Sequence, residues 1–218
     1  GSDATFRIRG VGTINNNDPL LVIDGVPVSS GLNTLNMNDV ESIQVLKDAS
    51  ATAIYGSRGA NGVVIVTTKR GKGDQSHLTF NYFSGIQKAT NVVEMLNARE
   101  FATMHNEIMG NAGLAQNPVY SDPSSLGTGT DWLGELFSPS PMQNYSVSYS
   151  GNSEKTNFYV SGNYLNQEGI IFNTGYKKLT MQFNSDTKVF DNLKFGNSLT
   201  LNNNIKTSGN YNIRNTML

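Results

Sequence analysis

Residues 76–218 alternate apolar and polar side chains along several segments, and this period of two constrains the fold more than any other feature. Successive side chains of a β-strand point to opposite faces, so each such segment has one apolar and one polar face. The polar positions hold mostly Asn, Ser, Thr and Gln rather than charged residues. The pattern predicts five antiparallel strands, centred on residues 78–82, 145–150, 157–164, 178–184 and 194–202.

The connections between these strands alternate between short and long. Residues 151–155 and 190–193 are short enough for tight hairpins. Residues 87–141 form a long insertion, and the connection at 167–176 is of intermediate length. In transmembrane barrels, short turns face the periplasm and long loops face outside. One interpretation is therefore a barrel wall. The other is a soluble sheet or sandwich, such as a carbohydrate-binding module, whose apolar face a second sheet covers.

The long insertion carries one predicted helix and one candidate contact site. Asn97 and Glu100 have the spacing of a capping box, which predicts a helix over residues 97–110. Farther along, Asp131 precedes Trp132. Aromatic faces stack on sugars, so the pair is a candidate substrate-contacting loop, and ordinary loop packing is the alternative explanation.

Residues 1–75 show a different pattern, in which short strands alternate with one short helix. We expect an α+β domain that ends in a polar linker. The predicted strands are 5–9, 20–23, 26–28, 40–46 and 62–68, and the predicted helix follows Asp48 and covers 49–55. Turn-forming residues are expected to end these elements: Gly10, Asp24, Gly25, Gly56, Gly59 and Gly62.

Composition and motif order exclude several classes of function. The formal net charge is −1, whereas a nucleic-acid binder needs a basic surface. The chain has no cysteine, so it forms no disulfide or thiolate metal site. Neither His77 nor His105 has the neighbours that nucleophilic or metal catalysis needs. The glycines from Gly56 to Gly62 follow the predicted helix, whereas a phosphate cradle precedes one. We expect no catalytic residue, metal or cofactor; a secreted enzyme would need an acid–base pair that the sequence does not reveal.

Four basic residues of the N-terminal region suggest a contact with a surrounding wall: Arg7, Arg9, Lys47 and Arg58. Arg7 and Arg9 share one face of a predicted strand. Inside a barrel, such cations would need carboxylate partners on the wall. The alternative is that all four are solvated surface charges.

Long strings of the sequence resemble one family. The run Phe6-Arg-Ile-Arg-Gly-Val-Gly-Thr13, together with residues 17–28 and 38–69, resembles the plug of the SusC/RagA-like TonB-dependent outer-membrane transporters. Residues 95–101, Asp131-Trp132 and residues 163–169 resemble the first barrel strands of the same family.

The resemblance implies an α+β plug domain at 1–75 and about five strands of an incomplete transmembrane β-barrel at 76–218. The whole barrel would have about 22 strands around the plug. Such proteins import glycans, oligosaccharides or peptides across the outer membrane of Gram-negative, Bacteroidota-type bacteria. Their partners are a SusD-like surface lipoprotein and the TonB–ExbB–ExbD complex, which pulls on a TonB box. We expect that box and most of the barrel to lie outside these residues. The family's arginine–glycine motif maps onto Arg9-Gly10, which implies that the basic residues lock plug to barrel.

Overall fold

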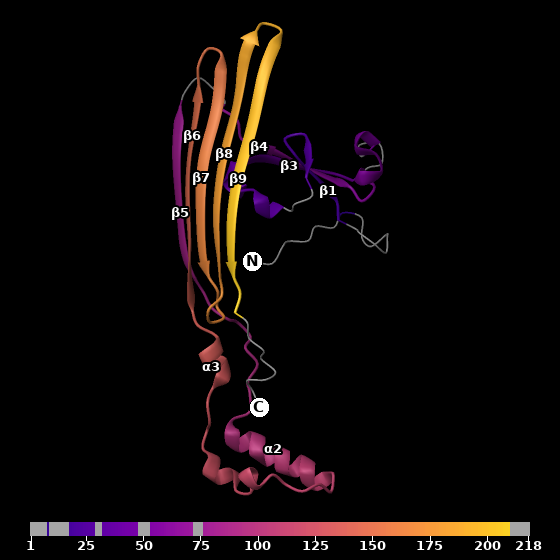
Figure 1. The fold of residues 1–218 in the computed structure, drawn as a ribbon, viewed down its shortest axis with the longest axis vertical. Coiled ribbons are helices and arrows are strands. Elements are labelled where there is room, and N and C mark those ends of the chain that lie inside the picture. The colour runs from indigo at the N-terminus through magenta and orange to yellow at the C-terminus, as the bar shows by residue number, and fades with distance from the viewer. Residues whose placement is uncertain (1–7, 9–17, 29–31, 48–52, 72–75, 210–218) are drawn as a thin grey trace. The chain divides into compact units, whose positions relative to one another are not determined.

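The computed structural model describes residue 8 and residues 18–28, 32–47, 53–71 and 76–209. Within these ranges, the N-terminal region forms a four-stranded sheet, called here the N-terminal sheet, in the order β2-β1-β4-β3. Strands β1 and β4 are parallel, and the other neighbours are antiparallel. Figure 1 shows these strands in indigo to purple. Their bounds are Leu20–Ile23 for β1, Val26–Val28 for β2, Val40–Leu46 for β3 and Val63–Thr68 for β4.

The core of the N-terminal sheet lies along its central parallel pair. Val22 of β1 and Val63 and Val66 of β4 are completely buried. Leu35 packs against this core from the segment before β3, where two short 3-10 turns cover Leu32–Thr34 (η1) and Met37–Asp39 (η2). All residues of β4 are β-branched, which is typical of a strand that is covered on both faces.

The helix predicted at 49–55 differs from the observed structure. Residues 48–52 lie outside the described part, and Ala53–Gly59 forms 3-10 turns (η3) instead of an α-helix. Gly56 interrupts them with φ 58° and ψ −146°, a conformation that glycine reaches without steric cost. Within residues 53–59 the chain therefore kinks instead of forming a regular helix.

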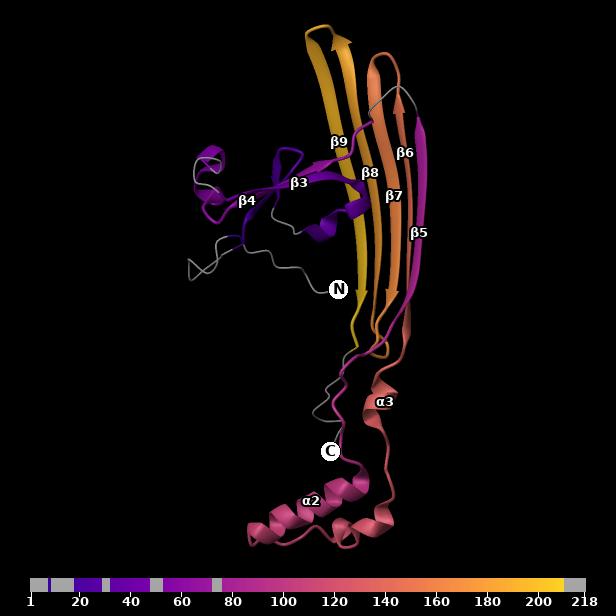
Figure 2. The ribbon, with the colours of Figure 1, turned by 180° about the vertical axis from the view of Figure 1, so that it is seen from behind.

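The second sheet, called here the long sheet, contains five antiparallel strands in sequence order. Figure 2 shows them from behind. The alternating pattern had predicted this meander and both of its tight hairpins, and the structure confirms these features. The strands are β5 (His77–Gln87), β6 (Ser140–Asn152), β7 (Thr156–Glu168), β8 (Gly175–Phe190) and β9 (Leu193–Thr207).

The insertion and the β7–β8 connection belong to a separate compact unit. Helix α2 has the predicted capping box, in which the Asn97 side chain accepts from Glu100 N and the Glu100 side chain accepts from Asn97 N. Phe101 and His105 of α2 contact the Tyr120 ring with centroids 5.9 and 5.0 Å away. None of the described helices is long and apolar enough to cross a membrane. The remaining elements are α2 (Ala98–Asn111), η4 (Pro118–Tyr120), η5 (Pro123–Leu126) and α3 (Trp132–Leu136).

Candidate functional site

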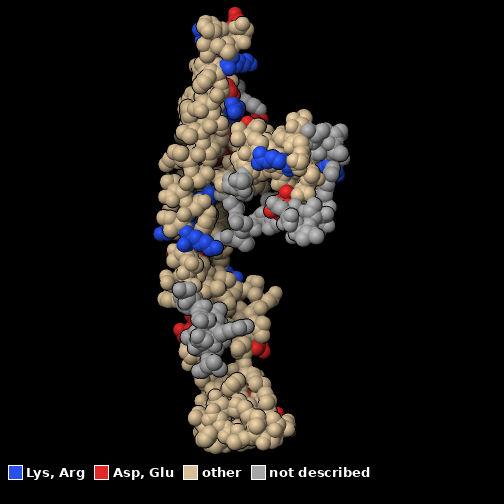
Figure 3. All heavy atoms as spheres, turned by 45° about the vertical axis from the view of Figure 1, so that its right-hand side comes forward, with Lys and Arg blue, Asp and Glu red and all other residues tan. Residues whose placement is uncertain are grey.

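In the central strands of the long sheet, β6–β8, the polar face is largely buried and the apolar face is exposed, whereas β5 and β9 are exposed along almost their whole length. On β8, Gln182 and Asn184 are 2% and 0% exposed, whereas Leu179 and Met181 on the other face are 38% and 48% exposed. The covered face is therefore the polar one, which the barrel interpretation expects and the sandwich interpretation does not. Charged atoms are few over these strands in Figure 3. No second layer of the described chain covers the apolar face, which a water-soluble sandwich would require. Further exposed apolar residues are Val147, Val160, Phe183, Leu199 and Leu201.

A hydrogen-bond network around Asn184 joins the two sheets. Asn184 Nδ2 donates to Thr68 Oγ1 over 2.8 Å and to Lys69 O over 2.7 Å. Its Oδ1 accepts from Ser198 Oγ over 2.8 Å. Asp24 accepts from Thr68 N and Thr68 Oγ1 over 2.8 and 2.5 Å, and Ser198 Oγ lies 3.2 Å from the same carboxylate. Because each polar atom of Asn184 has a partner, the residue pays no penalty for an unpaired group.

Two further hydrogen bonds join the sheets, and they involve Asp39 and Lys178. Asp39 at the end of η2 is completely buried, and its Oδ1 accepts from Tyr159 Oη of β7 over 2.7 Å. Its Oδ2 has no hydrogen-bond partner in the described structure. Lys178 of β8, which is 8% exposed, donates from Nζ to Leu35 O over 2.9 Å. A buried carboxylate is costly unless it is paired. Tyr159 supplies a hydrogen bond to Asp39, and the Lys178 ammonium supplies a favourable charge interaction with it.

The linker after β4 rests directly on the long sheet. Arg70 forms an ion pair with Asp186, and the two side chains are 29% and 38% exposed. The next residue, Gly71, lies so close to β6 and β7 that an added Cβ would stand 2.5 Å from Phe158 O and 2.6 Å from Gly151 O. Both obstacles are backbone atoms and cannot rotate away. Only glycine therefore fits at position 71 without a backbone shift.

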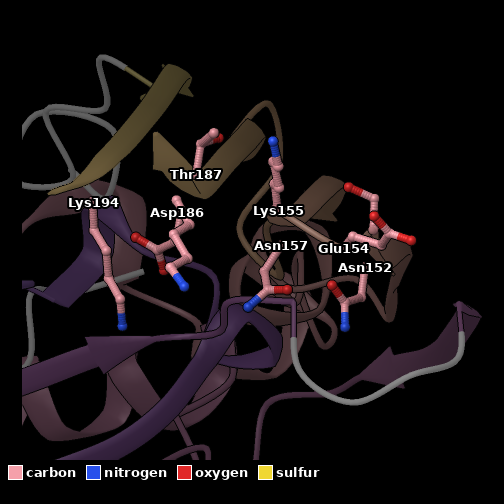
Figure 4. A pocket seen from close by; sticks show the side chains of 9 residues that line it. Asn152, Glu154, Lys155, Asn157, Asp186, Thr187 and Lys194 are labelled. Carbon is pink, nitrogen blue, oxygen red and sulfur yellow. The ribbon is translucent and has the colours of Figure 1, made fainter. Parts of the chain in front are cut away.

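A polar hollow lies between the β6–β7 hairpin and the parts of β8 and β9 next to the hairpin that joins them. Its volume is about 540 Å³. Figure 4 shows the side chains of Lys155 and Asn157 around it together with Asp186 and Lys194. Because Asp186 also pairs with Arg70, this ion pair borders the hollow and is exposed to solvent, which weakens it. The lining residues are Asn152, Ser153, Glu154, Lys155, Asn157, Asp186, Thr187, Lys188 and Lys194.

Of the four basic residues proposed to lock plug to barrel, the structure describes Lys47 and Arg58. Arg7, Arg9 and Gly10 lie outside the described residues. Lys47 and Arg58 are exposed, and they follow the end of β3 and precede the start of β4. They therefore lie at the opposite end of the N-terminal sheet from Thr68. Their locking role stays a prediction that depends on residues after 218.

The predicted turn residues occupy bends in the N-terminal region. Asp24 and Gly25 join β1 to β2 with φ values of 48° and 85°. Gly56 and Gly62 also have positive φ, and Gly59 is buried between them. Asp24 does more than form a turn, because its carboxylate also takes part in the Asn184 network.

Asp131 and Trp132 begin helix α3 in the insertion. The Asp131 side chain accepts from Gly134 N over 3.0 Å and so caps the helix. Trp132 is 54% exposed. The carboxylate is therefore used locally, and the indole ring is the part of this candidate site that can meet a ligand.

The residues that join the sheets were not singled out from the sequence. Asn184, Tyr159 and Lys178 belong to the polar face that the alternation predicted, but nothing in their local sequence separates them from their polar neighbours. The available signal was the face itself, because each of them has the parity of a buried position.

Known proteins show which family the chain resembles. Residues 1–63 match the family model described as TonB-dependent Receptor Plug Domain. Over these residues the chain is therefore similar to TonB-dependent receptor plug domains. TonB-dependent receptor P26 of Formosa agariphila is 42% identical over 202 residues, covering 90% of this chain and 20% of that protein. TonB-dependent receptor SusC of Bacteroides thetaiotaomicron is 35% identical over 207 residues, covering 89% of this chain and 20% of SusC.

A solved structure extends the likeness beyond the plug domain. The RagAB peptide importer in the 'open-open' state superimposes with a TM-score of 0.80 at 30% identity. That alignment covers 94% of this chain and 26% of the matched chain. The chain thus spans about a fifth to a quarter of the length of the relatives it matches. The resemblance to SusC/RagA-like receptors and the fold class of plug domain plus antiparallel strands are both confirmed. The relatives are named as receptors and importers, not as enzymes.

Proposed function

We propose that this chain is part of an outer-membrane transporter that imports large nutrients by energy-coupled displacement of its plug domain. The substrate class is glycan or oligosaccharide, or peptide as in the RagAB importer. Transport of this kind is gated passage and needs no catalytic residue.

The burial of the long sheet carries this proposal. Its polar face carries the plug domain, and its apolar face is exposed at residues such as Leu201, which is 55% exposed. A sheet in a bilayer must meet lipid with apolar side chains and must close on itself, because no free strand edge is tolerated in hydrocarbon. A soluble carbohydrate-binding module would leave this apolar surface in water.

We assign residues 1–75 to the plug domain and residues 76–218 to the first strands of a barrel wall. The insertion at 87–141 would then face outside the cell, because it joins strands at the end opposite the tight hairpins. The plug would lie inside the barrel and face the periplasm. Trp132 is exposed in this insertion and is the candidate for contact with substrate.

The proposed partners follow from the relatives. A SusD-like lipoprotein would cap the extracellular mouth, as the resemblance to the SusC/RagA-like family implies. The TonB–ExbB–ExbD complex would supply energy through a TonB box outside these residues. Outer-membrane lipid would cover the exposed apolar face.

Deletion of the full-length gene tests the proposal. Uptake of fluorescent oligosaccharides and of fluorescent peptides is measured in wild-type, deletion and TonB-deficient cells. We expect one of the two classes to be lost in both mutants and to be restored by the full-length gene in the deletion strain. Undiminished uptake of both classes, or recovery of the full-length protein in the soluble fraction, would contradict the proposal and favour the soluble module.

A further inference from the structure

Three tyrosines lie side by side on the apolar face of the long sheet. Tyr145 of β6 lies directly opposite Tyr164 of β7, and the ring centroid of Tyr82 of β5 lies 5.0 Å from that of Tyr145. All three side chains are exposed. Because β5, β6 and β7 are neighbours in the sheet (Figure 1), the three rings form one row, called here the tyrosine row.

The tyrosine row separates a polar part of this face from an apolar part. Toward the start of β6, the next pair on the same face is Gln143 and Asn166. Toward the β6–β7 hairpin, the next pair is Val147 and Gly162. Tyrosine has an apolar ring and a polar hydroxyl, and it gathers where a barrel wall passes from water to hydrocarbon. The row therefore indicates the level of lipid headgroups, and the apolar part of the face starts at Val147 and Gly162.

An apolar hollow of about 380 Å³ lies in this apolar part, across β6, β7, β8 and β9. Neighbouring strands are about 4.8 Å apart, so the hollow extends over roughly 14 Å across the sheet. Ser148, Ser161 and Gln182 border it, but their side chains belong to the polar face by the period of two. Of the side chains that line it from the apolar face, Tyr149 has a hydroxyl, and the others contain neither nitrogen nor oxygen: Val147, Val160, Met181, Phe183, Leu199 and Leu201.

Gly162 of β7 leaves the space of a missing side chain in the apolar hollow. Its backbone does not require glycine, because Gly162 is not among the residues with positive φ. Close packing does not require glycine either: among the described atoms, an added Cβ would meet Val147 Cγ1 at 3.9 Å, an ordinary contact distance. Glycine weakens the interior of a strand, and where it occurs it often marks the close approach of a ligand. An occupant from outside the chain accounts for glycine at this position.

The size and chemistry of the apolar hollow fit a hydrocarbon chain. A dry apolar cavity of about 150 Å³ binds benzene, so this hollow accommodates on the order of ten carbon atoms. A sugar or peptide group would lose its hydrogen bonds to water against such a lining. The hollow is also continuous with the face that the proposed transporter turns toward lipid. It starts one residue pair, about 7 Å along the strands, from the tyrosine row, which is the depth at which acyl chains begin.

We propose that the apolar hollow at Gly162 holds one acyl chain of a membrane lipid whose headgroup lies at the tyrosine row. This proposal rests on the proposed transport function, because it requires the apolar face to lie in a bilayer. It adds a defined lipid-binding site to a face that would otherwise meet only mobile lipid.

Photo-crosslinking of the full-length protein tests the proposal. The protein is reconstituted into vesicles of phosphatidylethanolamine and phosphatidylglycerol that contain a trace of phosphatidylethanolamine with a diazirine in one acyl chain. After illumination, mass spectrometry compares the labelling of Met181 and Leu201 in the hollow with that of two reference residues on β5, Leu78 and Phe80. The reference residues are 73% and 67% exposed, whereas Met181 and Leu201 are 48% and 55% exposed. Exposure alone therefore predicts more labelling on β5.

We expect the two residues in the hollow to be labelled several-fold more than the two reference residues. Gly162→Leu fills the hollow and should remove this excess. Val189→Leu adds volume to β8 outside the hollow and should leave the excess unchanged. If Gly162→Leu lowers the amount of protein that inserts into the vesicles, Gly162→Val replaces it.

Three results would overturn the proposal, and they differ in what they leave standing. Labelling that follows exposure and does not respond to Gly162→Leu would mean that the lipid is mobile there, and the barrel assignment would stand. Labelling of the reference residues alone would mean that something else fills the hollow, and a smaller oligomer of Gly162→Leu in light scattering would identify a second copy of the chain. Labelling of neither pair would show that the face does not meet lipid, and the barrel assignment would fail as well.

Discussion

Asn184 of β8 donates to Thr68 Oγ1 of β4 over 2.8 Å, and both residues are completely buried although 116 positions separate them. The amide also holds the next carbonyl, Lys69 O, so one side chain fixes both the last strand residue and the first linker residue. A neutral amide suits this position because it donates and accepts without bringing a charge into the contact.

Replacement of Asn184 with Ala should weaken the docking of the plug. The change leaves Thr68 Oγ1 and Lys69 O without their donor, which costs about 1–3 kcal/mol for buried groups. Denaturant unfolding of the full-length protein in detergent and protease cleavage of the linker after Thr68 measure the effect. Asn204→Ala, at an exposed position of β9, is the matched control and should behave as wild type. Equal stability of the two variants would show that Asn184 does not stabilise the contact between the two sheets.

Gly71→Ala should be more disruptive than its size suggests. The new methyl group would meet backbone oxygens of Phe158 and Gly151 at 2.5 and 2.6 Å, so the linker must shift away from β6 and β7. Overpacking of this kind costs about 1–3 kcal/mol. Gly110→Ala in helix α2 is the control, because nothing lies within 4 Å of its added Cβ. There the same change should stabilise the helix by about 0.5–1 kcal/mol. Thermal unfolding of both variants decides, and a tolerated Gly71→Ala would refute the close fit.

Tyr159→Phe should destabilise the plug contact through Asp39. The buried carboxylate already has no partner at Oδ2, and the variant removes the partner at Oδ1. Loss of a hydrogen bond to a charged group costs about 1.5–3 kcal/mol. Asp39→Asn in the same background should recover part of that loss, because a neutral amide is cheaper to bury. A double-mutant cycle measures this coupling, and additive losses would show that the two side chains act independently.

The sequence predicted local features well because local physics determines them. Alternation specifies which residues share a face, and this was enough to predict β5–β9, but it left open which of the two faces is covered. The pair Asn97 and Glu100 predicted the start of α2 because both partners of a capping box lie within one turn.

The contact between the two sheets could not be predicted from the sequence, because it depends on how far the N-terminal sheet lies along the strands of the long sheet and on the register between them. Alternation places Asn184 and Gln182 on the same face, yet only the three-dimensional register brings Asn184 opposite Thr68. The contact uses mostly amides, hydroxyls and backbone groups, together with the ion pair of Arg70 with Asp186. The helix after Asp48 was predicted from composition, and the positive φ of Gly56 is a conformational detail that composition does not contain.

The turn η5 in the insertion should loosen at low pH. Hydrogen bonds from the side chain and backbone of Ser124 hold the pKa of Asp122 below its ordinary value. A carboxyl whose pKa is lowered by folding stabilises the fold above its unfolded pKa of about 4, and this contribution is lost as the pH falls through the lower folded value. Amide exchange at Ser124 should therefore accelerate in that acidic window. Asp122→Asn should abolish the pH dependence, and an unchanged pH profile in this variant would assign the effect to another group.

Met181→Arg should impair membrane insertion of the full-length protein and leave the contact between the two sheets unchanged. Met181 is 48% exposed on the apolar face of β8, between the buried Thr180 and Gln182 of the polar face. A cation facing the middle of the bilayer costs about 2–4 kcal/mol in a transmembrane barrel. Refolding into lipid vesicles and the amount of protein in the outer-membrane fraction measure that cost, with Met181→Leu as the control that keeps the face apolar. Arg and Leu variants that insert equally well would mean that this face meets water or another protein layer, and the barrel assignment of residues 76–218 would then fail.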